Sequence, residues 1–285
     1  LLNCISPNFL APVPAMGVVQ LNPNHSDVAL KKGISLSAGT VLQSQVAKGI
    51  NTPCKFRVGH SLTLWPLVIQ AIEHGPFKAH VPTMRGGKQP RSALLVTIEN
   101  STHSALSQLP LDELDFHVSC GDEYAYALLE RLCHQTVSVG IRAPEQVDWQ
   151  WLPLPCVAAL GLDDSQALLP VHSNQFSGMR LLQEFFAFPA RFLFFRVQGL
   201  RRFLASCQHS TFQLAFCFAE PNTELDRVVG VDSLALNCTP VVNLFEQNCD
   251  RVLLDERLHE VQVQPNRSKP HDFEVHSVLG VQGYG

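Results

Sequence analysis

The residues that could take part in catalysis are few, and their spacing does not assemble a catalytic group. Asp163 and Asp164 are adjacent, so their side chains diverge on a strand or a turn, whereas paired acid–base catalysis needs two carboxylates directed at one substrate. His271 and His276 lie five residues apart, which on a strand puts them on opposite faces and argues against a shared metal ion. The adjacent aspartates are therefore interpreted as a solvated turn.

The segment Gly86-Gly87-Lys88 has part of the composition of a phosphate-binding loop, but Gln89 follows the lysine and the upstream glycine is missing. We interpret it as the centre of a polar loop. The sequence also contains no GxSxG, HExxH or GxxxxGK(S/T) motif. It therefore predicts no catalytic residue, no metal site and no cofactor.

Composition places the chain among globular cytoplasmic proteins. It has 285 residues, of which 46% are hydrophobic, enough for a sizeable core and more than one ordinary domain. A net charge of −4 argues against a nucleic-acid surface, which needs clustered basic residues. Nine scattered cysteines without a CxxC pair favour reduced thiols over a disulfide scaffold or a zinc site. No signal peptide and no membrane-spanning run of roughly 20 apolar residues is recognised.

The densest apolar stretch, from Phe176 to Leu200, must organise the second half of the chain. Helical spacing predicts a helix over residues 178–188, Pro189 ends it, and the apolar run that follows predicts a buried strand over residues 191–198. We expect the phenylalanines of both elements to lie in the core rather than on a partner surface: Phe185, Phe186, Phe194 and Phe195.

Short alternating segments with turn signals between them predict strands through most of the remaining chain, including residues 16–21, 93–98, 114–118 and 212–218. A change of period over residues 121–133 predicts a helix capped by Asp122. Segments 258–264 and 272–278 are expected to form a hairpin. The fold class is thus α+β and mainly β, with sandwich- or barrel-like domains and a few interspersed helices.

A proline-flanked segment with two tryptophans, residues 143–155, is the best candidate for a domain boundary. It divides the chain into a β-rich domain with one helix, 1–148, and a second β-rich domain, 149–285, organised around the helix 178–188 and the strand 191–198. Trp149 and Trp151 are assigned a packing role between these domains.

Five arginines give the organising stretch a local basic bias: Arg180, Arg191, Arg196, Arg201 and Arg202. The favoured interpretation is that their stems cover apolar surface while their heads stay in water. The alternative is contact with an acidic partner surface.

The segment Cys238–Glu246 is the candidate partner-binding segment. Thr239, Pro240 and Asn243 interrupt an otherwise apolar strand and predict that part of the segment is irregular and near the surface, while apolar anchors remain available. An internal plug between the domains is slightly favoured over a partner contact. The candidate contact residues are Pro240, Val241, Val242, Asn243, Leu244 and Phe245.

Six segments in order give the chain a family resemblance: LLNCISPNFLAPVPAM, CKFRVGHSLTLWPL, LGLDDSQALLP, LLQEFFAFPARFLFF, LNCTPVVNLFE and HDFEVHSVLGVQG. The chain resembles the TssF family (also called ImpG or VasA), a component of the type VI secretion baseplate. The resemblance covers essentially the whole chain, but the family has a helical lead before the equivalent of Leu1 and a substantial portion after that of Gly285. The chain is therefore expected to be an internal fragment.

The resemblance implies a structural, non-enzymatic subunit of a contractile injection machine. It implies a wedge in which two TssF copies pair with one TssG, joined to TssK and the sheath-initiating TssE, with six wedges around the VgrG hub. It places the protein in the cytoplasm, at the inner face of the cell envelope through the assembled baseplate. No nucleic acid and no direct membrane insertion are implied.

A function of another class remains open on the residues alone. A β-sandwich that binds carbohydrate or another small ligand, possibly as an enzyme, would present aromatic side chains on a concave sheet. Its candidates would be Trp65, Trp149 and Trp151.

Overall fold

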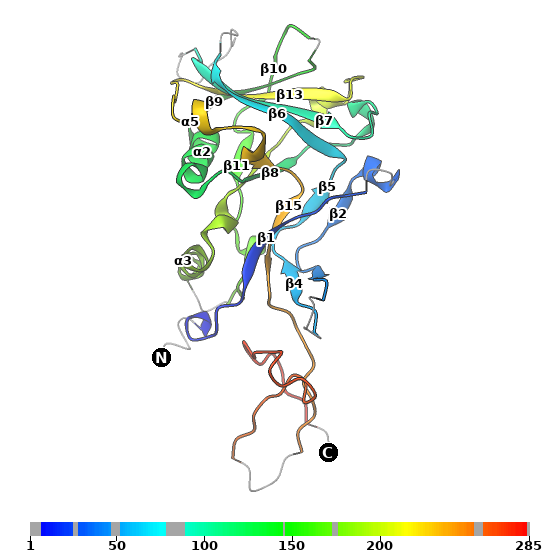
Figure 1. Cartoon of the computed structure of the whole chain (residues 1–285), viewed down its shortest axis with the longest axis vertical. Coiled ribbons are helices and arrows are strands. Elements are labelled where there is room, and N and C mark those ends of the chain that lie inside the picture. Colours follow the sequence, from blue (N-terminus) through cyan, green and yellow to red (C-terminus); the bar gives the residue numbers. More distant parts are fainter. Residues whose placement is uncertain are drawn as a thin grey trace.

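Four antiparallel sheets organise the part of the chain that the structure describes (Figure 1). This computed structural model describes residues 7–24, 28–46, 52–77, 89–144, 146–172, 176–253 and 259–283. The strands are β1 (Met16–Gln20), β2 (Ile34–Leu36), β3 (Val41–Gln43), β4 (Lys55–Val58), β5 (Leu62–Leu64), β6 (Leu67–Pro76), β7 (Ser92–Asn100), β8 (Leu114–Val118), β9 (Thr136–Arg142), β10 (Gln150–Trp151), β11 (Val157–Ala159), β12 (Phe194–Val197), β13 (Thr211–Phe218), β14 (Leu234–Ala235) and β15 (Cys238–Val242).

Helices are few and mostly short in the described part of the chain. The α-helices are α2 (Asp122–His134), α3 (Ser177–Ala187), α4 (Arg201–Leu204) and α5 (Leu225–Val228). The 3-10 turns are η1 (Pro7–Phe9), η2 (Val28–Lys32), η3 (Leu106–Gln108), η4 (Asp164–Gln166), η5 (Pro189–Phe192) and η6 (Val231–Ser233). The expected α+β, mainly β class is confirmed. The helix α2 begins at Asp122 with Gly121 as its N-cap, one residue before the expected cap.

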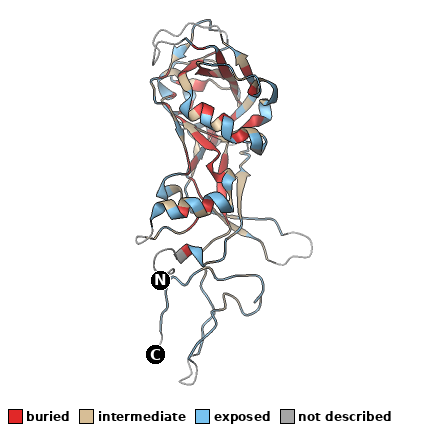
Figure 2. Cartoon of the chain, turned by 90° about the vertical axis from the view of Figure 1, so that its left-hand side faces the viewer, coloured by how far each residue is buried: buried red, intermediate tan, exposed pale blue. Residues whose placement is uncertain are grey.

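The main core lies between two sheets. One has the strand order β10-β9-β13-β7-β6 and the other has the order β11-β12-β8-β14. Phe195 of β12 stacks on Phe116 of β8 with ring centroids 5.0 Å apart, and it meets Phe216 of β13 edge-on at 6.0 Å. All three rings are fully buried. These two sheets form the upper body of the molecule, and Figure 2 shows the buried strands inside it.

The central strand β13 is buried on both faces over most of its length. On its outer face Ala215 and Cys217 are small, and Trp149 and Trp151 pack against the cluster that they form. A Cβ at Gly140 would come within 2.9 Å of Trp149 and 3.0 Å of Trp151, so only glycine lets these rings lie against β9. The tryptophans therefore cover a sheet instead of packing between two domains.

A third sheet, β1-β15-β4-β3, forms the lower body. Its central strand β15 is buried at every residue although it contains Pro240. The missing N–H of Pro240 would face β4, where the proline instead accepts a 2.8 Å hydrogen bond from the Gly59 N–H through its carbonyl oxygen. The proline thus keeps one of its two ladder hydrogen bonds to the β4 side through its carbonyl oxygen.

The strand pairing joins the two halves that the sequence predicted as separate domains. The pairs β1–β15, β4–β15, β7–β13 and β8–β12 each combine a strand from residues 1–148 with one from 149–285. The proposed boundary at 148/149 therefore runs through shared sheets. Alternating patterns locate strands along the chain, but they carry no information on long-range pairing.

Two expected elements differ in the structure. The strand after Pro189 is shorter than predicted, because η5 occupies Pro189–Phe192 before β12 begins at Phe194. The expected hairpin is wrong for the described residues 259–264 and 272–278, where no strand is present. Their side chains are mostly exposed, and the loop around Gly86 lies outside the described residues.

Two histidines, the buried His60 and the half-buried His117, flank Phe194, where the sheet β11-β12-β8-β14 meets the lower sheet. The ring of Phe194 lies 5.4 Å from that of His60 and 4.6 Å from that of His117. Burial, followed by the charges of Arg191 and Arg196, lowers the pKa of His60 to about 3. Burial lowers the pKa of His117 to about 4. Both histidines are therefore neutral at physiological pH and behave as core aromatics.

The expected core assignment is confirmed for Phe194 and Phe195 and wrong for Phe185 and Phe186. Phe194 and Phe195 are 1% and 0% exposed, whereas Phe185 and Phe186 are 41% and 79% exposed. Helical spacing showed that α3 has an apolar face, but the structure turns most of that face to solvent.

We expect Phe194→Ala to lower the free energy of unfolding by about 3–5 kcal/mol, because it leaves a cavity between His60 and His117. The matched variant Phe186→Ala should change it by less than about 1 kcal/mol, because its ring is already in water. Urea unfolding of both variants measures the difference. Equal effects would contradict the assignment of one ring to the core and the other to the surface.

Candidate interaction surface

The helix α3 is turned with its charges inward. Its sequence, SGMRLLQEFFA, contains two charged residues, Arg180 and Glu184, and these are 1% and 0% exposed. They lie four residues apart and so share one face of the helix. Apolar side chains occupy the opposite face, which is the reverse of the usual surface helix.

Glu184 is the centre of a buried ion cluster, which we define as Asp164, Arg180, Glu184 and Arg191. Its Oε1 accepts hydrogen bonds from the backbone N–H of Leu168 at 3.1 Å and of Leu169 at 2.9 Å. Its Oε2 pairs with Arg180 at 3.1 Å and with Arg191. Both oxygens are thus satisfied by donors from three separate segments, as a buried carboxylate requires.

The two arginines are matched by acceptors as well as by Glu184. Arg180 Nη2 donates to Asp164 Oδ1 at 2.7 Å, and the Asp164 side chain is about half exposed. Arg191 Nη2 donates to the carbonyl oxygens of Gly161 at 2.8 Å and Gln166 at 2.9 Å. Two carboxylates balance two guanidinium groups, so the cluster carries no net charge.

Burial, with a smaller contribution from the Arg180 charge, lowers the pKa of Arg191 to about 9. This value still leaves the guanidinium protonated at neutral pH, so Arg191 faces Glu184 as a cation. The cluster therefore places at least one protonated guanidinium, that of Arg191, against the buried carboxyl group of Glu184.

The loop between β11 and α3 fixes the cluster to the lower body. Gly161 adopts φ +94°, a conformation that favours glycine, and thereby directs its carbonyl oxygen at Arg191. Further along, the Leu168 carbonyl accepts a 2.8 Å hydrogen bond from Arg57 of β4. The side chain of Leu168 lies against Gly59, where a Cβ would come within 2.3 Å of it. These contacts with β4 thus help to fix which face of α3 is turned inward.

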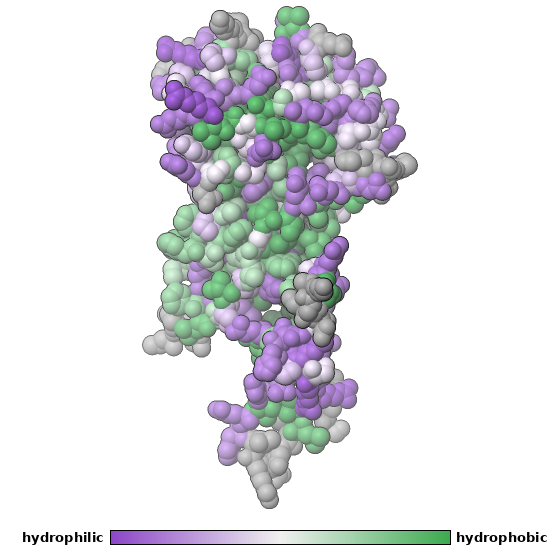
Figure 3. Space-filling view, in the orientation of Figure 1, coloured by the Kyte–Doolittle hydropathy of each residue, from purple (hydrophilic) through white to green (hydrophobic). Residues whose placement is uncertain are grey.

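The consequence is an exposed apolar surface, which we call the α3 outer face. Its members are Phe176, Met179, Leu182, Phe185 and Phe186, exposed by 77%, 39%, 53%, 41% and 79%. Tyr126 of α2, 38% exposed, adjoins it through a 6.4 Å edge contact with Phe185. Figure 3 shows apolar residues gathered over the flank where α3 lies. A contiguous exposed apolar patch of this kind is typical of an interaction site.

The segment Cys238–Glu246 only partly matches the expected surface segment. Pro240, Val241 and Val242 are buried inside β15, so the interruption expected at Pro240 is wrong and the irregular part of the segment begins at Asn243. Asn243, Leu244 and Phe245 follow the strand and are half-buried. Phe245 lies 6.4 Å from Phe273 and below Lys55, whose Nζ is 5.0 Å from the ring centroid.

The arginines of the organising stretch also differ from expectation. Arg180 and Arg191 are buried rather than solvated. Arg196 binds Asp115 through two hydrogen bonds, at 2.6 and 2.9 Å, and pairs with Glu113 at 2.7 Å. Asp164, predicted to be part of a solvated turn, pairs with Arg180. Arg201 and Arg202 are the exposed members of the set.

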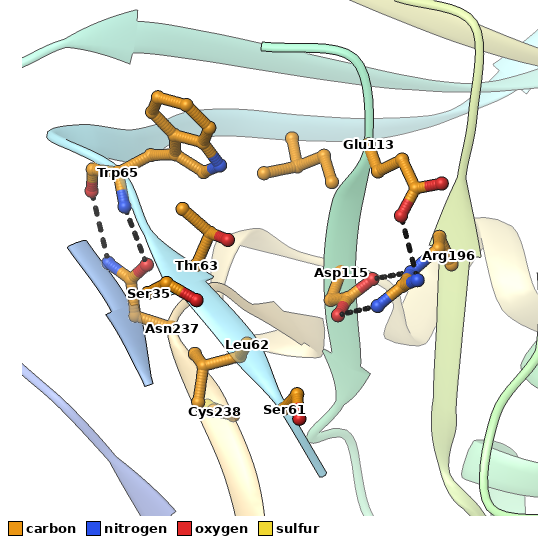
Figure 4. A pocket seen from close by; sticks show the side chains of 11 residues that line it. Ser35, Ser61, Leu62, Thr63, Trp65, Glu113, Asp115, Arg196, Asn237 and Cys238 are labelled. Atoms are coloured by element: carbon orange, nitrogen blue, oxygen red, sulfur yellow. Dashed lines mark hydrogen bonds and ion pairs between the residues drawn. The ribbon is translucent and has the colours of Figure 1, made fainter. Parts of the chain in front are cut away.

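A polar pocket of about 180 Å³ lies between β5 and β8 (Figure 4). Arg196, Asp115 and Glu113 form one wall, and Thr63 and Trp65 belong to the other. The charges of the first wall are already paired with one another, as the dashed contacts in Figure 4 show. The pocket therefore presents no charged group that awaits a ligand.

The three tryptophans of the carbohydrate-binding alternative do not form one surface. Trp65 is 6% exposed and belongs to the main core. Trp149 and Trp151 lie together on the outer face of the five-stranded sheet, with the Arg142 guanidinium 4.3 Å from the Trp149 ring centroid. Without a shared concave platform, this alternative loses the geometry on which it depends.

Among the described residues, no group of three or more His, Cys, Asp or Glu side chains is placed to hold a metal ion. The described helices likewise include none with the length and apolar content needed to cross a bilayer. The eight described cysteines are free thiols.

Comparison with known proteins assigns the family. The profile of the family described as "Type VI secretion system, TssF" matches residues 1–285. The chain is 38% identical over 287 residues to the type VI secretion system component TssF1 of Pseudomonas aeruginosa, covering 100% of this chain and 46% of that protein. The chain belongs to the TssF family, and it spans about half the length of this relative.

A solved structure supports the same fold. It is described as the type VI secretion system TssK-TssF-TssG baseplate subcomplex, determined by cryo-electron microscopy. The match has a TM-score of 0.79 and 24% identity, and it covers 97% of this chain and 50% of the other. At this identity the likeness bears on the fold alone.

Sequence reasoning missed the ion cluster and therefore the α3 outer face. The available signal was the isolated pair Arg180 and Glu184, four residues apart, in an otherwise apolar stretch that also contains Arg191. Charged side chains in such a stretch are either solvated or paired with one another. The sequence could not decide between these cases, because the backbone partners Gly161, Leu168 and Leu169 lie outside the stretch.

We expect Glu184→Gln to lower the free energy of unfolding by about 3–5 kcal/mol, because it leaves two buried guanidinium groups with one partly exposed carboxylate. The matched variant Glu123→Gln, at an exposed position of α2, should change it by less than about 0.5 kcal/mol. Denaturant unfolding near neutral pH measures both. Indistinguishable unfolding curves would contradict a structural role for the ion cluster.

Proposed function

We propose that the protein containing this chain is a structural, non-enzymatic subunit of a type VI secretion baseplate. The single observation that carries the proposal is the match of the whole chain to the TssF family, with 38% identity to the Pseudomonas aeruginosa component. The described residues supply what such a subunit needs, namely strands from both halves joined in shared sheets and an exposed apolar surface. Its work is mechanical: it holds neighbouring subunits in place and transmits their movement.

Its direct partners in this proposal are subunits of the TssG and TssK type. The solved subcomplex with the same fold contains TssK, TssF and TssG, which supports this choice. A second TssF copy, TssE and the VgrG hub complete the proposed wedge and its surroundings. The protein would then work in the cytoplasm, at the inner face of the envelope.

The half-buried residues after β15 belong to the proposed contact surface. Asn243, Leu244 and Phe245 begin the extended segment that leaves the lower body in Figure 1. Phe245 contacts Phe273 and Lys55 and so anchors that segment to β4. A partner that covers this junction would bury the remaining exposed parts of these side chains.

The full-length protein, coexpressed with the TssG- and TssK-type subunits of the same organism, is expected to coelute with both in size-exclusion chromatography. Titration of the purified complex with a panel of soluble oligosaccharides should leave tryptophan fluorescence unchanged. Elution of the full-length protein apart from both subunits would contradict the proposal. Saturable quenching by one sugar would favour the carbohydrate-binding alternative.

A further inference from the structure

The Phe194 ring lies where the upper and lower bodies meet, with a histidine on either side of it. His117 is a residue of β8 in the upper body and stands opposite Phe194 in the β8–β12 ladder. His60 lies in the turn between β4 and β5, and its ring meets Phe194 edge-on with the planes 71° apart. We call Phe194, His60 and His117 the histidine seam.

Backbone contacts fix His60 to the lower body. Its N–H donates to the Thr239 hydroxyl at 3.4 Å, and that hydroxyl donates to the His60 carbonyl oxygen at 3.2 Å. The preceding Gly59 N–H donates to the Pro240 carbonyl oxygen at 2.8 Å. The two imidazoles of the seam thus belong to different bodies, so a change in either ring acts on the contact between those bodies.

Neither imidazole has an acceptor for a second proton at its Nε2 atom. The Nε2 atoms of His60 and His117 are buried, and no hydrogen-bond partner for them is found among the described residues. A neutral imidazole can leave one nitrogen without a proton, whereas an imidazolium carries an N–H group on both. Protonation would therefore bury a donor without an acceptor, together with a positive charge.

The charged groups on the His60 side do not compensate for that proton. Burial, and after it the charges of Arg191 of η5 and Arg196 of β12, lower the pKa of His60. The carboxylates that these two arginines face are already paired with them: Glu184, Glu113 and Asp115.

The surroundings of His117 are mostly uncharged. Its ladder neighbours are Phe194 and Ala235. Asp115, two residues away on β8, is bound by Arg196 through two hydrogen bonds. Cys238 of β15 packs in the same cluster as Phe194, and burial raises the pKa of its thiol to about 11, so it stays neutral. Each element packed on the seam therefore favours neutral imidazoles.

We propose that the histidine seam is an acid-sensitive joint, in which uptake of a proton by either imidazole opens the Phe194 contact and loosens the lower body from the upper body. The joint lies within one chain, so the proposal holds whether or not the protein assembles with the proposed partners.

Protons favour the open joint. Burial lowers the pKa of His60 to about 3 and that of His117 to about 4, whereas an opened seam returns both rings to water, where histidine has its ordinary pKa of 6.5. The joint is therefore most stable at neutral pH, and it weakens as the pH falls below 6.5 toward the lowered values. Between pH 7 and pH 5 the opening constant should rise roughly twentyfold for each histidine.

Thiol labelling of the full-length protein measures the opening. Cys238 is buried beside Phe194, so a reagent reaches it only when the seam opens. The probe is 4,4′-dithiodipyridine, which reacts with thiols at acidic pH, and each rate is divided by that of the same thiol in denatured protein at the same pH. The normalised rate at Cys238 should rise at least roughly twentyfold from pH 7 to pH 5. Cys217, buried in the five-stranded sheet, is the internal control and should not follow.

Two variants assign the effect to the imidazoles. His60→Gln and His117→Gln each replace a ring by a side chain that does not titrate, so each should reduce the rise at Cys238 by roughly twentyfold. His134→Gln, at the exposed end of α2, is the matched control and should keep the full rise. Exchange of the imidazole C2 hydrogens in the unaltered protein follows the titration of each ring directly, so the test does not depend on the variants folding.

Lowered titration of both rings, with a rise at Cys238 that the glutamine variants reduce, supports the joint. Titration of both rings near 6.5 in the folded protein would overturn it. So would a rise at Cys217 equal to that at Cys238, which indicates global unfolding, or a full rise at Cys238 in both glutamine variants.

Discussion

A buried carboxylate is the constraint on which much of this structure depends. Glu184 has no exposed surface, so its charge must be balanced inside the protein, and the donors come from α3, η5 and the loop before α3. Removing any one donor leaves charge or an unpaired carbonyl in a site that water does not reach. These segments therefore move together or not at all, and α3 behaves as a rigid attachment of the body.

That rigidity extends from the ion cluster into both sheets. Leu168 connects the cluster to β4 through Arg57 and Gly59, and Arg191 is followed within three residues by Phe194 of β12. Phe194 in turn lies between His60 and His117, which burial keeps neutral. A force applied to α3 would thus reach the sheets β1-β15-β4-β3 and β11-β12-β8-β14 through packed side chains. This property suits a subunit that holds neighbours during a mechanical event.

The sequence was sufficient to locate elements that have a regular hydrophobic pattern. The alternation in Leu114–Val118 and the helical period of α2 locate both elements to within one or two residues, because each pattern reflects local geometry. It was insufficient for the face that α3 buries, since the same spacing of Phe185 and Leu182 is compatible with either rotation. The choice depends on Arg191, Gly161 and Leu168, whose approach is a long-range property. The expected hairpin failed in its described residues, 259–264 and 272–278, for a similar reason: an apolar pattern predicts a strand only where another strand is available to pair with it.

The most direct measurement of the central claim is hydroxyl-radical footprinting of full-length protein, first alone and then in complex with the TssG- and TssK-type subunits. Met179 and Phe186 should be oxidised readily in the free protein, because 39% and 79% of their surface is exposed, and they should become protected on assembly. Val147 should be oxidised equally in both states. Protection of Phe186 in the free protein, or unchanged oxidation of Phe186 on assembly, would contradict an outward apolar face held for a partner.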